Sequence, residues 1–337
     1  MLLTLPEHHQ VLFVAGKGGV GKTVLASTIA LARAEVGARV LLVSTDPAHS
    51  LGHLWQREVG DAITALGPPG LYGLEIDPTR TTEQHVQEVQ QRLEPLVPDR
   101  LRSQVRRHLR LARQAPGTFE AALLERVAGT LEEQLDQMDL VVFDTAPSGH
   151  TIRLVSLPET MSAWTNAMLD QHGRSQKLTR ALQGLDGEDP GLDLVTDSDQ
   201  RGRRSDRDSE IRRTLLARQE RLTRLRELLQ DARRTAFVAV LVAERLPMLE
   251  TIDLVEQLDE ARMQAAALVV NKRSPVDAGD LLARRRRQEQ DHLQMITSRF
   301  PDLPLVQLPL LGDDIAAPAG LHALATALKE APDTVQG

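Results

Sequence analysis

The chain contains no cysteine among its 337 residues. This absence excludes disulfide bridges, iron–sulfur clusters and zinc sites built from thiolates, and it removes the usual ligand for soft metalloids such as As(III). Aromatic residues make up only 2% of the sequence. Leucine, valine, isoleucine and alanine must therefore fill the core.

Long apolar runs are also missing. The longest, Ala236–Ala243, is too short to span a bilayer. The first residues, Met1–His8, lack a basic region followed by an apolar stretch, so we predict no signal peptide. We therefore expect a cytoplasmic protein without stable membrane insertion.

The charge of the chain argues against general nucleic-acid binding. The net charge is −7, and only five of the 40 basic residues are lysines. Arginines cluster in Arg102–Arg110 and Arg284–Arg287, but acidic residues lie nearby and aromatic residues for base stacking are absent. We interpret these clusters as solvated helix faces and expect no nucleic-acid partner.

Short runs rich in β-branched residues alternate with helical stretches along the chain. Such nearly continuous apolar runs predict an α/β fold with a doubly wound, mostly parallel sheet that is covered on both faces. The predicted strands are Val11–Ala15, Arg39–Ser44, Leu71–Ile76, Leu140–Asp144, Ala236–Ala243, Ala267–Asn271 and Leu305–Leu308.

Two stretches depart from this alternation and are rich in arginine and leucine. We assign residues 1–80, 136–153 and 235–337 to the sheet domain, and residues 81–135 and 154–234 to an inserted helical subdomain. Acidic residues, glycine and proline near 184–208 predict a mobile loop within the insert.

A glycine-rich loop follows the first predicted strand. The segment Gly16–Thr23 reads GKGGVGKT and leads into a predicted helix over Val24–Ala34. This is the phosphate-binding P-loop pattern in its required context of strand, loop and helix. Its glycines let backbone N–H groups surround a phosphate, Lys22 is expected to reach the β- and γ-phosphates, and the Thr23 hydroxyl is expected to bind Mg²⁺.

A second lysine, Lys17, follows the first glycine of the loop. A simple P-loop does not require it, and an extra cation is useful where charge develops during phosphoryl transfer. Here the sequence resembles the deviant-Walker class of dimeric ATPases. That resemblance implies that Lys17 reaches across a two-fold interface to the nucleotide of the partner subunit.

Two apolar runs end in aspartate. Asp46 follows the run Val40–Ser44 closely, and Asp144 ends the run Leu140–Asp144, which is the Walker B pattern. Ligands of open α/β sheets bind beyond the carboxyl ends of the strands. Both carboxylates are therefore expected near the bound phosphates.

The ordered motifs of the chain resemble those of the arsenical-pump-driving and tail-anchored-protein-targeting ATPase family. They are GKGGVGKT, STDPAHSL (44–51), EIDP (75–78), Pro116-Gly117 followed by Glu120, DTAPSGHT (144–151), VVNK (269–272) and LPLL (308–311). The resemblance spans nearly the whole chain, although the helical insert matches by pattern more than by residue.

The resemblance implies a Mg²⁺-dependent ATPase that works as a homodimer. Asp46 would be a catalytic residue that orients the attacking water. Lys17 and Lys22 would be the other catalytic residues. Asn271 would read adenine, with Pro309 and Leu310 supplying backbone contacts to the base. The residues predicted to contact ATP are Gly16, Lys17, Gly18, Gly19, Val20, Gly21, Lys22, Thr23, Val24, Asn271, Pro309 and Leu310. The predicted Mg²⁺ site contains Thr23, Asp46 and Asp144, with the aspartates acting through water.

The chain also departs from the family pattern. Val24 stands where the family usually has a second threonine. Eukaryotic targeting members hold their dimer with a Cys-x-x-Cys zinc site before the segment resembling Arg284–Gln288, and this chain cannot form it. We therefore expect no zinc and no direct activation by As(III) or Sb(III).

Apolar stripes in the insert allow two interpretations. They include Leu154, Leu157, Met161, Trp164, Met168 and Leu169, and then Ile211, Leu215, Leu222, Leu225 and Leu229. The stripes are either the packed core of the insert or, as the family implies, part of a groove for an apolar client helix.

Three functions remain open at this point. The first is an ATP-driven factor that targets membrane-destined helices. The second is an energising subunit for a membrane transporter, and the third is a spatial-organisation ATPase. The last usually carries a basic amphipathic C-terminal helix, whereas Leu321–Lys329 is short and weakly charged.

Overall fold

The computed structural model describes residues 2–46, 50–93, 118–145 and 219–330, the last range without Asp314 and Ala316. It also describes the single residues Arg107, Arg213, Leu216 and Ala217. The strands are β1 (Val11–Gly16), β2 (Val40–Ser44), β3 (Thr64–Ala65), β4 (Leu71–Glu75), β5 (Leu140–Asp144), β6 (Thr235–Val242), β7 (Ala265–Arg273) and β8 (Leu305–Pro309).

Helices connect these strands. They are α1 (Leu5–His8), α2 (Lys22–Glu35), α3 (Ser50–Trp55), α4 (Pro78–Leu93), α6 (Thr118–Gln134), α9 (Arg245–Glu260), α10 (Asp280–Arg299) and α11 (Pro318–Glu330). Residues 219–230 are helical as well. No helix in these described ranges combines the length and the apolarity that crossing a membrane requires.

The strands form one sheet in the order β3-β4-β2-β5-β1-β6-β7-β8. Every neighbouring pair is parallel except β3 and β4, which are antiparallel. β1 lies in the middle, between β5 and β6. The predicted doubly wound, mostly parallel sheet is therefore confirmed.

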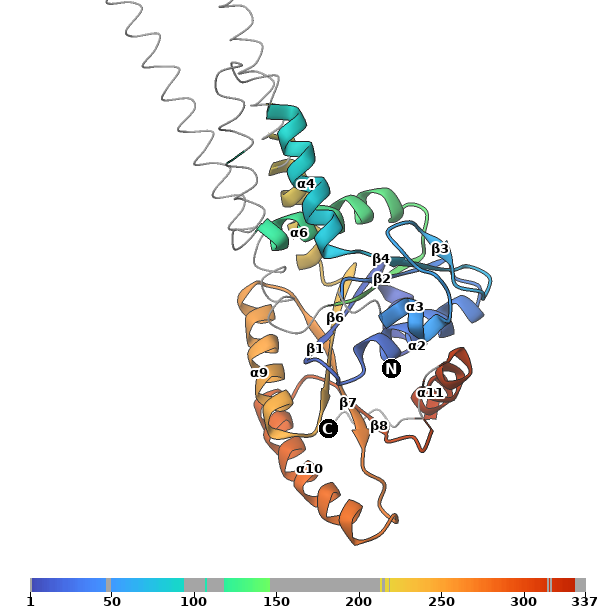
Figure 1. Cartoon of the computed structure of the whole chain (residues 1–337). Coiled ribbons are helices and arrows are strands. Elements are labelled where there is room, and N and C mark those ends of the chain that lie inside the picture. Colours follow the sequence, from blue (N-terminus) through green and yellow to red (C-terminus); the bar gives the residue numbers. More distant parts are fainter. Residues whose placement is uncertain are drawn as a thin grey trace, which may run out of the picture.

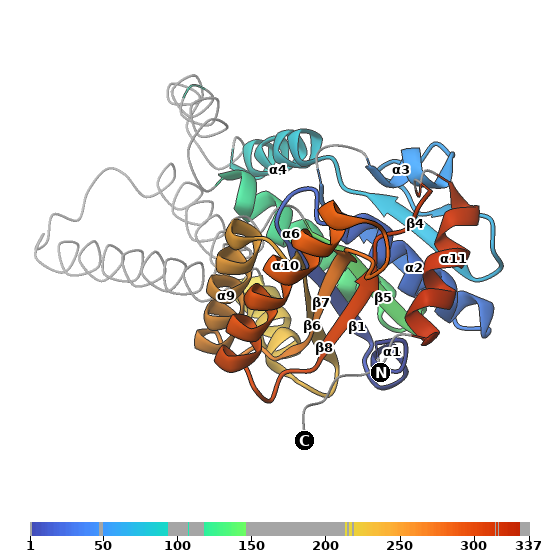
Figure 2. The same ribbon diagram turned by 90° about the horizontal axis from the view of Figure 1, so that it is seen from below.

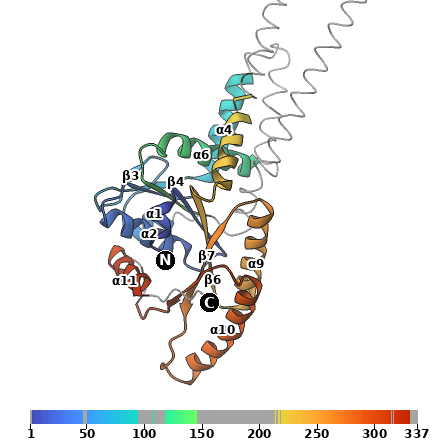
Figure 3. The same ribbon diagram turned by 180° about the vertical axis from the view of Figure 1, so that it is seen from behind.

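Helices cover both faces of the sheet (Figure 1). Seen from below, α2 and α11 lie on one side of the strands, and α6, α9 and α10 lie on the other (Figure 2). The view from behind shows the same division (Figure 3). Parallel sheets need this cover because strand residues on both faces are apolar, and all six positions of β1 are buried.

Alternate residues of the central strands supply two separate cores. Val11, Phe13 and Ala15 of β1 pack toward α6, α9 and α10, whereas Leu12 and Val14 pack toward α2 and α11. On the first face, Phe13 stacks between Phe143 of β5 and Phe237 of β6, with ring centroids 4.7 and 4.9 Å away. A chain poor in aromatic residues thus places three of its five phenylalanines across the middle of the sheet.

Helices that the sequence assigned to the insert share a core with the sheet. Leu123 and Val127 of α6 belong to the same apolar cluster as Phe13, and so do Leu222, Leu225 and Leu229. These three leucines therefore belong to the packed core and not to an open groove. The other stripe residues and the loop near 184–208 lie outside the described residues, and the subdomain boundaries stay a prediction.

Two details of the sequence interpretation change. The two-residue strand β3 was not predicted, because Thr64–Ala65 is too short to produce an apolar run. Arg284, Arg285 and Arg287 of α10 are exposed, as the solvated face predicts, but the cluster also forms specific contacts. Arg285 donates to Glu244 and Glu289, and Arg286 donates to the Ser274 carbonyl at 2.6 Å, so these two side chains fasten α10 to its neighbours.

Candidate active site

The glycine-rich loop lies at the carboxyl end of β1, in the middle of the sheet. β1 ends at Gly16, and α2 begins at Lys22 with Gly21 as its N-cap. The first N–H groups of a helix have no partner within it, and they form a binding site for anions. The loop and the start of α2 therefore offer a cradle for phosphate.

At two positions of the loop, close contacts leave no room for a side chain. A Cβ at Gly16 would lie 2.2 Å from the Val240 carbonyl oxygen of β6. Gly21 has φ +99°, and a Cβ there would lie 2.4 Å from Asn271 Nδ2. The loop is thus packed directly against β6 and the end of β7, and larger residues at these positions would displace it.

Both lysines of the loop have partners. Lys22 is buried, and its Nζ donates a hydrogen bond to the Lys17 carbonyl at 3.0 Å. Burial lowers the pKa of Lys22, and the charges of Asp144 and Asp46 oppose that shift. Lys17 Nζ lies 2.8 Å from Glu250 Oε1 on α9.

Asp144 is completely buried at the end of β5. Its Oδ2 accepts hydrogen bonds from the hydroxyls of Thr23 (2.6 Å) and Ser44 (3.5 Å), whereas its Oδ1 has no hydrogen-bond partner among the described residues. Burial raises the pKa of Asp144 to about 6, against the opposing effects of Thr23 and Lys22. A buried carboxylate oxygen without a partner is costly, so this atom indicates a position for a cation.

Asp46 follows β2 and belongs to the same group of charges. Its backbone N–H donates to Ser44 Oγ at 3.3 Å. Its negative charge opposes the lowering of the Lys22 pKa by burial, and it contributes to the raised pKa of Asp144. Because β2, β5 and β1 are neighbours, their carboxyl ends bring Asp46, Asp144 and Lys22 together.

A cavity of about 340 Å³ lies beside the loop. Its lining combines segments far apart in the sequence: Gly21, Val24, Asn271, Lys272, Pro309, Leu310, Leu311, Gly312, Asp313, Ile315 and Leu324. The predicted base contacts are among them. Apolar walls with a few polar groups are typical of small-molecule sites.

Asn271 lines this cavity and binds the glycine-rich loop through its side chain. Its Nδ2 donates to the Val20 carbonyl at 2.8 Å, and its Oδ1 accepts from the backbone N–H of Lys272 at 2.9 Å. A side-chain amide carries two donor hydrogens and two acceptor lone pairs. Within the described residues, one donor hydrogen and one acceptor lone pair of Asn271 are unused, so they are available to a ligand.

Sequence reasoning missed several residues of this site. Lys272 has φ 56°, unusual for a residue with a side chain, and its Nζ donates to the Gly19 carbonyl at 3.2 Å. Ser44 contacts both Asp144 and Asp46, and Glu250 pairs with Lys17. The scarcity of lysine was a signal for Lys272, which follows Asn271 directly.

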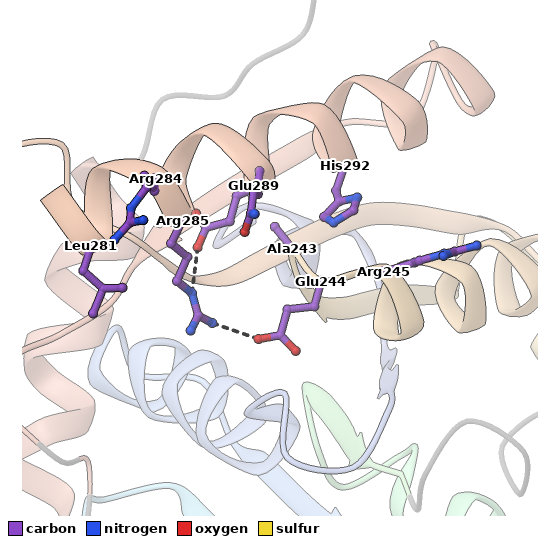
Figure 4. Close-up of a pocket in the computed structure, with 9 residues that line it drawn as sticks. Ala243, Glu244, Arg245, Leu281, Arg284, Arg285, Glu289 and His292 are labelled. Carbon is purple, nitrogen blue, oxygen red and sulfur yellow. Dashed lines mark hydrogen bonds and ion pairs between the residues drawn. The ribbon is translucent and has the colours of Figure 1, made fainter.

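A second, larger cavity of about 510 Å³ lies between the start of α9 and the first half of α10 (Figure 4). Arg285 projects between Glu244 and Glu289 there and is paired with both (Figure 4). The lining contains no residue of the glycine-rich loop. We therefore identify the smaller cavity, beside the loop, as the candidate nucleotide site.

Comparisons with known proteins agree with this geometry. The sequence profile of the family described as "Anion-transporting ATPase" matches residues 9–330. "ATPase ASNA1 homolog 1" of Paramecium tetraurelia is 28% identical over 314 residues, with 92% of this chain and 89% of the relative covered. "ATPase GET3" of Komagataella phaffii is 31% identical, with 90% and 85% covered.

A further relative is longer. "Putative arsenical pump-driving ATPase" of Halobacterium salinarum is 30% identical over 94% of this chain but only 44% of its own length. The family predicted from the motifs is thereby confirmed. With a profile match over nearly its whole length and the phosphate-binding loop folded at the middle of its sheet, the chain belongs to the anion-transporting ATPase family and is an ATPase.

Proposed function

We propose that this ATPase is a Mg²⁺-dependent, homodimeric nucleotide switch of the cytoplasm that binds apolar helices of membrane-destined proteins. The observation that carries the catalytic part is the group formed by Lys22, Thr23, Asp46 and Asp144 beside a cavity that contains Asn271 and Pro309. The nucleotide would lie with its base in this cavity and its phosphates in the loop.

The residues present fit a magnesium ion. Asp144 Oδ1 is buried and has no partner in the part of the chain that the structure describes, and the hydroxyl of Thr23 lies beside the same carboxylate. Carboxylate and hydroxyl oxygens are ligands that Mg²⁺ accepts. Thr23 and Asp144 would hold the ion, with Asp46 nearby, and the ion would neutralise charge on the β- and γ-phosphates.

The remaining roles belong to the chain itself. Lys22 would leave the Lys17 carbonyl and contact the phosphates, where its charge stabilises the transition state. Asp46 would orient a water for in-line attack on the γ-phosphate. Lys17 would act on the nucleotide of the partner subunit, as in the deviant-Walker class.

Composition favours the targeting function over an arsenite-pump function, because the chain has no cysteine with which to capture a metalloid. The chain is also similar to relatives named "ATPase GET3" and "ATPase ASNA1 homolog 1" over most of their length. Because Leu222, Leu225 and Leu229 are buried in the core, any client groove must use other residues of the insert.

The variant Asp46→Asn tests the catalytic role. We expect it to bind Mg-ATP with nearly unchanged affinity and to lose turnover, measured by isothermal titration and phosphate release. Equal loss of binding and turnover would contradict the role of Asp46. Thr64→Ala, on the distant strand β3, is the control variant and should keep both.

The same variant tests the client. Asp46→Asn is incubated with Mg-ATP and a purified peptide that carries one apolar helix of about 20 residues, the length that spans a bilayer. We expect co-elution with this peptide and none with a version that has two central leucines replaced by aspartate. No retention of either peptide would favour the transporter or the spatial-organisation function.

A further inference from the structure

The ion pair between Lys17 and Glu250 joins the glycine-rich loop to α9. Lys17 Nζ and Glu250 Oε1 are 2.8 Å apart, although the residues are 233 positions apart in sequence. Both side chains are about one-third exposed, at 35% and 39%. The pair therefore lies at the surface, beside the phosphate-binding loop.

The backbone of Lys17 is held independently of this pair. Gly16 before it is pressed against the Val240 carbonyl, and the Lys17 carbonyl accepts the hydrogen bond from Lys22. In the nucleotide-free protein, the side chain of Lys17 can therefore change partner without moving the loop. Its direction toward α9 thus depends on Glu250.

Glu250 places a carboxylate beside the glycine-rich loop. The loop and the start of α2 form a site for anions, and an unpaired negative charge beside such a site repels phosphate. Pairing with Lys17 neutralises Glu250. The pairing also keeps the ammonium of Lys17 on its own subunit, where it contacts α9 instead of a nucleotide.

We propose that Glu250 is a positioning residue that retains Lys17 on its own subunit until bound nucleotide draws the lysine away. This inference rests on the role of Lys17 in the proposed function. Exposed ion pairs are weak and shift an equilibrium by about fivefold at most. The several negative charges of a triphosphate can outcompete one such carboxylate. Glu250 therefore disfavours the release of Lys17 only modestly and does not prevent turnover.

The first test measures the Lys17 amine directly. The chain has only five lysines, so brief treatment of the nucleotide-free protein with an amine-reactive reagent, followed by peptide mass spectrometry, reports each one. An amine held 2.8 Å from a carboxylate is less accessible to the reagent and reacts more slowly. We expect Glu250→Gln to raise the modification rate of Lys17 up to about fivefold, relative to exposed Lys329 as internal reference.

A matched control is Glu256→Gln. It removes an exposed ion pair of the same helix, between Glu256 and Arg299, and should leave Lys17 reactivity unchanged. Equal Lys17 reactivity in Glu250→Gln and wild type would overturn the proposal.

Turnover provides the second test, as a double-mutant cycle. Glu250→Gln should raise basal turnover up to about fivefold in the wild-type background and have no effect in Lys17→Ala. If Lys17→Ala turns over like the wild type, the proposed role of Lys17 fails. If Lys17→Ala is inactive and Glu250→Gln turns over at the wild-type rate or more slowly, only the retention by Glu250 fails.

Discussion

Gly21 and Asn271 show at the residue scale how tightly the loop is packed. Gly21→Ala would place a Cβ 2.4 Å from Asn271 Nδ2 at a φ of +99°. We expect a loss of about 1–3 kcal/mol in the free energy of unfolding, because the new methyl group must displace the amide that holds the Val20 carbonyl. Urea denaturation of the nucleotide-free protein measures this loss.

Gly18 offers a control within the same loop. A Cβ there would have no atom of the described residues within 4 Å. Gly18→Ala should therefore leave the free energy of unfolding within about 0.5 kcal/mol of the wild-type value. Similar losses in both variants would indicate that the loop tolerates no side chain at all, and that the contact with Asn271 is not the cause.

Asp144 gives the metal-free protein a pH dependence. Its pKa is about 6 in the folded state, above its ordinary value near 3.8, so the folded protein holds this proton more tightly than the unfolded chain does. The contribution of Asp144 to stability is present below about pH 4 and is lost as the pH rises through about 6. It amounts to about 3 kcal/mol at most.

The variant Asp144→Asn removes this titration. With a chelator present, its free energy of unfolding should fall less than that of the wild type between pH 4 and pH 7. Thermal and urea denaturation at several pH values compare the two proteins. Parallel curves would show that the carboxyl of Asp144 does not carry the proton.

The sequence could predict the residues of the loop but not all their partners. Lys22, Thr23 and Asp144 belong to short patterns whose chemistry is local, and the fold brings them together. Glu250 and Lys272 lie 233 and 253 positions from their partners in the loop. Such contacts follow from the order of the strands, which periodicity does not reveal.

At the scale of elements, a buried ionic network attaches α10 to the end of β7. Glu289 accepts from Arg273 Nη1 (2.6 Å), from the Ser274 hydroxyl (2.6 Å) and from the Ser274 backbone N–H (3.1 Å). Arg273 and Glu289 are both almost inaccessible to solvent. The residues before Arg273 on β7 are Asn271 and Lys272, so the network also anchors the strand that supports the nucleotide cavity.

Glu289→Gln tests this network. We expect a loss of about 3–5 kcal/mol in the free energy of unfolding, because Arg273 keeps a buried charge without a counter-ion. Glu256→Gln, which removes an exposed ion pair between α9 and α10, should cost less than about 1 kcal/mol. Chemical denaturation of both variants and the wild type separates the two cases, and equal losses would contradict the special role of burial.

The elements themselves were largely predictable. Buried parallel strands such as β5 and β6 are continuous apolar runs, and the sequence marks them clearly. Helix α6 was harder to assign, because its residues do not reveal whether they pack on the sheet or on other helices. The exposure of Arg284, Arg285 and Arg287 on α10 agrees with the solvated face, whereas the contact of Arg286 with the Ser274 carbonyl follows only from the tertiary fold.

At the scale of the whole molecule, the proposed dimer makes a distinctive prediction. Lys17→Ala and Asp46→Asn should each be inactive as pure proteins. If Lys17 acts in the partner subunit, a mixed dimer contains one complete site, with Asp46 from the first variant and Lys17 from the second. An equimolar mixture should then recover about a quarter of wild-type turnover, since half of the random dimers are mixed and each has one site.

The measurement is phosphate release after the two variants have been mixed and allowed to exchange subunits. A mixture as inactive as its components would mean that Lys17 serves its own subunit. Mixing Lys17→Ala with Glu256→Gln in place of Asp46→Asn provides the positive control, because the Glu256→Gln homodimers have two complete sites.

The central position of β1 also has a consequence for synthesis on the ribosome. The glycine-rich loop is translated before its partners, because its strand pairs with β5 and β6, which begin at Leu140 and Thr235, and its cavity is lined by Pro309 and Leu310. A nascent chain thus carries an intact motif without a place to bind the base until Leu310 has been translated. Nucleotide binding can therefore separate chains that contain Leu310 from chains truncated before it, even when both contain every residue of the loop.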